Sequence, residues 1–183
     1  MTLLSFKFHG PAIDICYANV PNLVEVFIGG RFPELVFAYF PRLSNNLSRL
    51  ERLTIFVPII PEEDVDDDGE PPEFPVLRKL KFLKLRVKAD NLDSLLVFDS
   101  LMKAVPSLDR LVVQFSNWRA PPIRRRRAQK VPKSPLRCLK VVELVGFWGR
   151  IPELEFATYL IKNAVMIEKI IIDPIPYHHV GLR

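Results

Sequence analysis

Residues Leu139–Pro174 carry the sequence LKVVELVGFWGRIPELEFATYLIKNAVMIEKIIIDP, which holds two β-like runs on either side of one amphipathic stretch. In both runs apolar side chains recur with the period of two that is typical of a strand with one buried face. Between the runs the apolar period changes to about 3.6 residues, the period of a helix. The stretch therefore predicts a strand, a glycine-bounded turn, a helix and a second strand.

The predicted helix has clear signals at both of its ends. Pro152 stands near the first helical position, Glu153 and Glu155 are in the first turn, and Lys162 comes late, each where the helix dipole or proline geometry favours it. We expect its apolar stripe to face the core, a stripe made up of Leu154, Ala157, Leu160, Ile161, Ala164 and Val165.

Partial copies of the strand pattern Lxx(L/V/I)x(L/I/V) recur along the rest of the chain, after an N-terminal partial copy, Leu4-Phe6-Phe8. The copies are Leu23-Val26-Ile28, Leu50-Leu53-Ile55, Leu77-Leu80, Leu108-Leu111-Val113, Leu139-Val142-Leu144 and Ile167-Ile170-Ile172. Their middle residues, with Leu80 as the third, are 27, 27, 31, 31 and 28 positions apart. These separations are in or just above the ~20 to 29 residue period of leucine-rich repeats. Around Phe82 and Leu83 the alternation slips, which indicates a bulge or a one-residue shift.

Strand and helix repeated at this period predict an α/β fold, a leucine-rich-repeat solenoid of about six to seven irregular repeats. In such a fold a curved parallel sheet has its helices and loops on the convex side. The 183 residues are expected to form this single domain. A second helix is predicted at about Leu92–Val105, and a short third one near Pro33–Ala38.

Charge is concentrated in two segments without apolar periodicity, although the net charge of the whole chain is only +5. Residues 61–73 are acidic and residues 119–133 are basic, and both are expected to be loop insertions. No run approaches the ~18 apolar residues of a membrane span, so a cytoplasmic or nuclear protein without membrane contact is expected. Cys16 and Cys138 have no metal or redox spacing, and buried, reduced thiols are expected.

Enzymatic chemistry has little support in the sequence. The histidines are His9, His178 and His179, and neither a glycine-rich phosphate loop nor a serine elbow is present. The acidic segment lacks the alternating ligands of a calcium loop. We therefore expect no catalytic residues, no cofactor and no metal site.

The basic segment contains Arg124, Arg125, Arg126, Arg127 and Lys130. Three interpretations stay open: a plain charged loop, a nuclear-import signal, or contact with nucleic acid or another anion. Nucleic acid is the least favoured partner, because the aromatic residues that stack on bases are absent here apart from Trp118.

A protein target is expected to bind to the concave face of the sheet, through side chains that alternate with the core positions. These candidates are Phe27, Thr54, Phe56, Val112, Gln114, Glu143 and Val145. Phe27 and Phe56 would act as aromatic anchors. The alternative is that neighbouring side chains, or a segment preceding the repeats, cover these apolar residues.

The stretch Leu139–Pro174 resembles the C-terminal repeat, the FBD-type segment, of plant F-box proteins with leucine-rich repeats. The resemblance lies in the LKVVEL strand, the GFWGR turn, the ELEFATYLIKNA helix and the IEKIIIDP strand. Residues 22–57 and 74–115 look like looser repeats of the same family.

The resemblance implies a protein-recognition module, similar to the substrate-binding part of an F-box ubiquitin-ligase receptor. In that family an F-box binds the adaptor of a cullin ligase, and the repeats hold the protein to be ubiquitinated. No segment of this sequence resembles an F-box, so the adaptor is expected as a partner only if an F-box is supplied elsewhere. A truncated decoy or scaffold, or a nuclear nucleic-acid-associated protein, are the alternatives.

Overall fold

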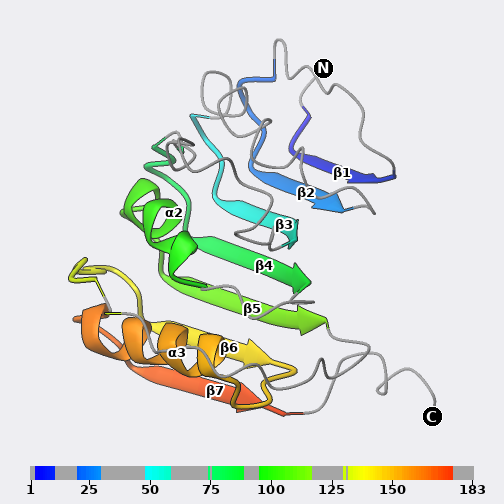
Figure 1. Ribbon diagram of the computed structural model, residues 1–183. Helices are drawn as coiled ribbons and strands as arrows, with labels where there is room; N and C mark the ends of the chain where they lie inside the picture. The colour runs from blue at the N-terminus through cyan, green and yellow to red at the C-terminus, as the bar shows by residue number, and fades with distance from the viewer. Residues whose placement is uncertain are drawn as a thin grey trace, which may run out of the picture.

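Seven parallel strands form one sheet in the computed structural model, which describes residues 3–10, 20–29, 48–58, 74, 76–88, 95–116, 130 and 132–174. The strands lie side by side in sequence order (Figure 1). The predicted α/β class and parallel sheet are thus confirmed. The strands are β1 (Ser5–His9), β2 (Glu25–Gly29), β3 (Arg52–Pro58), β4 (Phe82–Lys88), β5 (Arg110–Ser116), β6 (Val141–Val145) and β7 (Lys169–Asp173).

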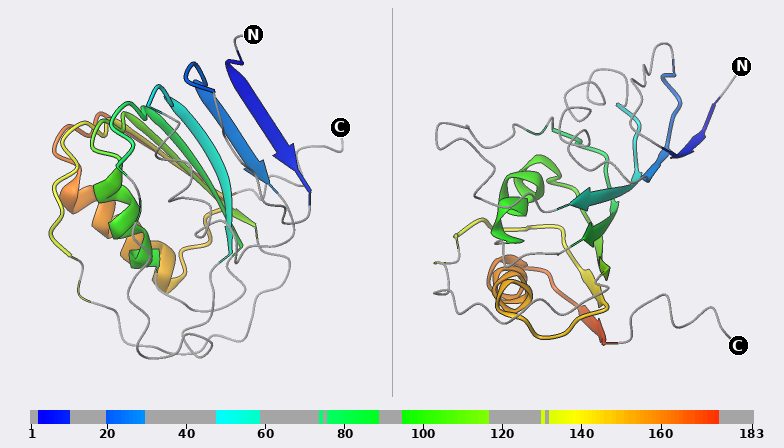
Figure 2. Two further views of the ribbon diagram at one scale, coloured as in Figure 1. Left: turned by 90° about the horizontal axis from the view of Figure 1, so that it is seen from above. Right: turned by 45° about the vertical axis from the view of Figure 1, so that its right-hand side comes forward.

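Two α-helices lie on one side of the curved sheet (Figure 2). Helix α2 (Phe98–Ala104) follows a single 3-10 turn, η2 (Leu95–Val97), and helix α3 (Ile151–Asn163) connects β6 to β7. Both helices were predicted, and the first residues of the expected helix at 92–105 lie outside the described residues. The short helix expected near residues 33–38 lies outside them as well.

The strands are aligned so that each core position faces the equivalent position of its neighbour. One row of directly paired residues runs through Val26, Leu53, Leu83, Leu111, Val142 and Ile170. A second row, two residues further on, runs through Ile28, Ile55, Leu85, Val113, Leu144 and Ile172. Except at β7, these side chains are buried, so the alternating pattern of each strand builds one continuous core.

Leu80, the middle residue predicted for the fourth strand, was wrong by three positions. Leu83, not Leu80, pairs with Leu53 and with Leu111, and no bulge interrupts the pairing of β3 with β4. Leu77, Leu80 and Leu83 are all buried. Three leucines at equal spacing made the start of the strand ambiguous in the sequence. With Leu83 the separations between equivalent residues become 27, 30, 28, 31 and 28.

A repeated backbone contact precedes every strand after β1. The carbonyl oxygen of Glu51, for example, accepts hydrogen bonds from the N–H groups of both Lys81 and Phe82 at 2.9 and 3.0 Å. The same doubly bonded carbonyl occurs at each step, in the order Leu4, Val24, Glu51, Lys81, Asp109 and Lys140. The chain therefore enters each strand with the same geometry, although the connections differ in length.

The buried face of α3 differs in part from the predicted stripe. Leu160 and Ala164 are buried as expected, whereas Leu154, Ile161 and Val165 are exposed. The side chains that fill the space under the helix are instead Phe156 and Tyr159, whose rings stack with 5.8 Å between centroids. The helix has apolar residues on two faces, and the larger aromatic rings occupy the core.

Gly146 and Gly149 turn the chain between β6 and α3, and both have φ of +73°. The turn is closed by Glu153, a buried residue of the first helical turn. One of its carboxylate oxygens accepts the N–H groups of Trp148 at 2.8 Å and Arg150 at 3.2 Å. The acidic residue predicted for the first turn thus satisfies two backbone donors that the helix itself cannot pair.

Replacing Gly146 with alanine is expected to destabilise the protein more than the same change at Gly149. Both positions impose a left-handed backbone that costs a side chain about 1 kcal/mol. A Cβ at Gly146 would also lie 2.7 Å from the carbonyl oxygen of Phe115, whereas at Gly149 the nearest atom is 4.0 Å away. Urea denaturation of the two variants measures the difference, and equal losses would contradict this assignment of the clash.

Cys138 is exposed, so the expectation of a buried thiol is wrong at this position. It lies in the segment that leads into β6, one residue before the buried Leu139. Cys16 and the acidic segment 61–73 lie outside the described residues. Among the residues that are described, no helix is both long and apolar enough to cross a membrane.

Candidate functional site on the open face of the sheet

The face of the sheet opposite the core and the helices carries every predicted protein-binding residue. We call it the open face. Strand register places its central side chains in two rows. The first row contains Lys7, Phe27, Thr54, Lys84, Val112, Glu143 and Ile171, and the second contains Phe56, Arg86, Gln114, Val145 and Asp173, while His9 pairs with Gly29 on the same face.

The predicted residues differ in how much of their surface solvent can reach. Val112, Gln114 and Val145 are buried, although they lie on the open face. The other four, Phe27, Thr54, Phe56 and Glu143, are half-buried. A partner that contacts this face would therefore meet chiefly the half-buried side chains on either side of β5.

Ion pairs cross the open face between neighbouring strands. Arg110 of β5 donates to a carboxylate oxygen of Glu143 of β6 at 3.0 Å. On the same face, toward the N-terminal strands, Arg52 of β3 lies 3.6 Å from Glu25 of β2, and its guanidinium also stands 4.4 Å from the ring centroid of Phe82. Two cations of β4, Lys84 and Arg86, lie between these two ion pairs.

Lys84 and Arg86 place two positive charges on one strand, two residues apart and on the same face. Burial lowers the pKa of the Lys84 ammonium, and the positive charge of Arg86 lowers it further, while Glu143 acts in the opposite direction. The two cations repel each other at the centre of the open face, and an anion placed beside them would be attracted to both.

The guanidinium of Arg86 has an unsatisfied donor. Within the described part of the chain, its Nε atom is buried and has no hydrogen-bond partner. Its neighbours in the second row are the half-buried Phe56 on β3 and the buried Gln114 on β5. A buried donor without a partner is unfavourable by about 1–3 kcal/mol, so an acceptor that reached this atom would bind favourably.

The sequence prediction missed Lys84 and Arg86, the two cations at the centre of the face. The cause is the choice of Leu80 as the core residue, because a period of two counted from Leu80 places positions 84 and 86 on the core face. Leu83, Leu85 and Val87 alternate with Lys84 and Arg86, and that alternation was the signal that could have identified them.

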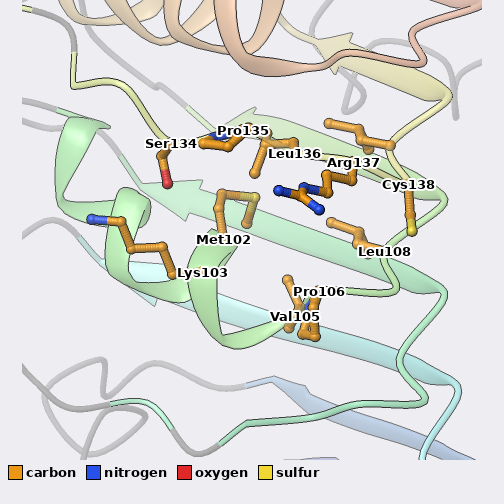
Figure 3. Close-up of a pocket in the computed structure, with 11 residues that line it drawn as sticks. Met102, Lys103, Val105, Pro106, Leu108, Ser134, Pro135, Leu136, Arg137 and Cys138 are labelled. Carbon is orange, nitrogen blue, oxygen red and sulfur yellow. The ribbon is translucent and has the colours of Figure 1, made fainter.

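A shallow cavity of about 320 Å³ lies on the other side of the sheet, between α2 and the segment that leads into β6. Its walls are mostly apolar and include Met102, Leu108 and Leu139. Figure 3 shows the guanidinium of Arg137 directed across the cavity toward Met102. The charged residues among those that line it are Lys103 and Arg137, both of them cations.

The remaining predicted site lies largely outside the described residues. Arg124, Arg125, Arg126 and Arg127 fall there, and the described Lys130 is exposed. Import or anion contact through these residues stays a prediction. In the described ranges, no group of three or more His, Cys, Asp or Glu side chains could hold a metal ion.

Comparison with known families gives one finding. A family model described as FBD matches residues 127–172, which include β6, α3 and all of β7 except its last residue. The match overlaps the stretch on which the resemblance to F-box proteins rests, and it supports an F-box-associated family. No curated protein and no solved structure matches the chain.

Proposed function

We propose that this chain is a non-enzymatic leucine-rich-repeat module that recognises a protein target, as the substrate-binding part of an F-box ubiquitin-ligase receptor does. Three observations support the proposal: the aligned rows of core leucines, the doubly bonded carbonyl before each strand, and the FBD match at residues 127–172. A cullin-ligase adaptor would join only through an F-box supplied elsewhere. The module would act in the cytoplasm or the nucleus.

The open face is the proposed binding surface, and Arg86 is the observation that carries the proposal. Its buried Nε has no partner among the described residues, and the half-buried ring of Phe56 stands next to it. Arginine and aromatic residues are enriched among the few residues that contribute most of the binding energy at interfaces. A rigid sheet presents them at a fixed spacing.

The chemistry of this surface favours a target that presents a carboxylate beside apolar side chains. A carboxylate of Asp or Glu can accept two parallel hydrogen bonds from one guanidinium, which is a short and strong arrangement. Phe56, next to Arg86, would contact the apolar part of the target. Lys84 would add attraction without directional hydrogen bonds.

Substitution of Arg86 by alanine is expected to weaken target binding by about 10- to 100-fold, the usual effect of removing a buried interface arginine. The full chain and its variants are used to purify partners from cell extract, and the retained proteins are compared quantitatively. Arg78→Ala is the matched control, because Arg78 is exposed in the turn before β4.

Proteins retained by the wild type and by Arg78→Ala, but lost with Arg86→Ala, would support the open face as the binding surface. An identical set of proteins with all three chains would overturn it. Cullin-ligase adaptor subunits in the same samples report separately on the F-box association. We expect them only when a chain with an F-box is added.

A further inference from the structure

Within the described residues β7 is the last strand of the sheet, and its core-row side chains are exposed. Ile170 and Ile172 of β7 are 38% and 53% exposed, whereas the paired residues of β6, Val142 and Leu144, are each 1% exposed. Ile170 and Ile172 occupy the two core rows, so they would be buried if another strand and its covering elements followed. The neighbouring Met166 is 53% exposed.

Helix α3 extends this apolar surface. Tyr159 and Asn163 contact the preceding elements, since the Tyr159 hydroxyl donates to Asp99 and the Asn163 amide donates to Pro132. Ile161 is two residues from each of them, and two residues on a helix are about 200° apart. Ile161, which is 58% exposed, therefore points away from those elements, and Leu154 and Val165 are exposed as well.

The backbone of β7 also presents hydrogen-bonding groups at this edge. Lys169 donates its N–H to Lys140, and the carbonyl of Asp173 accepts from Gly146, so alternate residues from 169 to 173 face β6. The N–H and C=O groups of Ile170 and Ile172 consequently point to the opposite side. Within the described residues β7 is the last strand of the sheet.

The sequence of β7, Lys-Ile-Ile-Ile-Asp, is complementary to itself when two copies run antiparallel. With Ile171 opposite Ile171 of the second copy, each Lys169 stands opposite an Asp173, and each Ile170 opposite an Ile172. This register pairs opposite charges on the open face and apolar side chains on the core face. Shifting the pairing by two residues loses both charge pairs.

We propose that the chain forms a two-fold symmetric dimer in which β7 pairs antiparallel with β7 of a second copy. Ile170 and Ile172 then exchange backbone hydrogen bonds with their counterparts, and their side chains continue the core across the axis. The exposed face of α3 is brought toward the same face of the other α3. The dimer covers the apolar end of the sheet and joins two seven-stranded sheets into one.

Ile171 provides a direct test, because it lies at the two-fold axis as a pair without backbone hydrogen bonds. Such pairs have Cα atoms about 4.5 Å apart, within the range of ~4.4 to 6.8 Å that a disulfide spans. In a full chain that carries Cys16→Ser and Cys138→Ser, Ile171→Cys is expected to form a disulfide-linked dimer on mild oxidation. Thr54→Cys, on the same face but four strands away, is the control and should stay monomeric.

The charge pairs give a second test. Lys169→Asp alone, or Asp173→Lys alone, should raise the dimer dissociation constant about tenfold, because two attractive pairs become two repulsive ones. The double variant restores both pairs in reversed order and should recover the wild-type dissociation constant. Analytical ultracentrifugation measures this constant, and denaturation of each variant checks that the fold is intact.

If another segment or another pairing covers the edge of β7, the experiments should give different results. A chain that stays monomeric at high concentration, for example because its own residues 175–183 cover β7, would overturn the proposal. Growth into larger species would do the same, since it would indicate head-to-tail pairing of β7 with β1. A dimer that forms but fails to cross-link through Ile171→Cys would exclude this register.

Discussion

Replacement of Phe156 by alanine should lower the free energy of unfolding by about 3–5 kcal/mol, the cost usually found when a fully buried phenylalanine is truncated. Phe156 is completely buried beneath α3. Its ring meets Phe98 of α2 edge-on at 6.0 Å between centroids and stacks on Tyr159 at 5.8 Å. The substitution removes contacts to both helices and leaves a cavity between them and the sheet.

Ile161→Ala on the same helix is the matched control for Phe156→Ala. Ile161 is largely exposed, so in the monomer its truncation should cost no more than about 0.5 kcal/mol. Urea denaturation at low and equal protein concentration keeps self-association out of the comparison. Similar losses for the two variants would contradict the assignment of Phe156, rather than the predicted stripe, to the core.

Asn163→Ala is expected to cost about 2–4 kcal/mol, because it leaves several polar groups without a partner. The side-chain oxygen of Asn163 accepts the N–H of Ser134 at 2.7 Å. Its amide nitrogen donates to the carbonyl of Pro132 at 3.0 Å and to that of Tyr159 at 2.9 Å. One buried side chain therefore holds the segment before β6 against the end of α3.

The change at Asn163 can be followed locally as well as by denaturation. Hydrogen exchange at the Ser134 amide should become faster in Asn163→Ala, because that N–H loses its acceptor. Lys162→Ala, at the exposed neighbouring position, should leave both stability and exchange nearly unchanged. Unaltered exchange at Ser134 in Asn163→Ala would contradict the structural role given to the amide.

The strands were predictable from the sequence because their signal is local. Each core residue of a strand alternates with a residue of the other face, so Val26, Leu53 and Val142 identified their strands directly. The fourth strand was assigned three residues too early, since Leu77, Leu80 and Leu83 fit the same pattern. Only the pairing with β3 and β5 shows which of these leucines lies in the strand, and that pairing depends on residues distant in the sequence.

The buried face of α3 was harder to predict because it depends on tertiary neighbours. More than half of its residues are apolar and they lie on more than one face, so amphipathicity alone did not show whether Ile161 or Phe156 is buried. The hydrogen bonds of Tyr159 to Asp99 and of Asn163 to Pro132 fix the rotation of the helix. Both partners are distant in sequence, and nothing in the helix itself indicates them.

The candidate site was found in part. Alternation placed seven residues on the correct face, but it could not show that Val112, Gln114 and Val145 are buried there. Arg86 was missed because the core position of its strand was assigned three residues too early, and the lack of a partner for its Nε among the described residues depends on surrounding atoms that the sequence does not show. Arg124–Arg127 were predicted as a site from their charge alone, and they lie outside the described residues.

The doubly bonded carbonyls before each strand have a consequence for how the open face can change. Equivalent residues are separated by 20 positions from β1 to β2 and by 27 to 31 from β2 onward, yet every strand is set beside the last by the same contact, about 4.8 Å away. Connections of different length therefore do not change the spacing of the strands. The strands of the open face keep a constant spacing, so a single substitution changes one side chain of this face without moving the others.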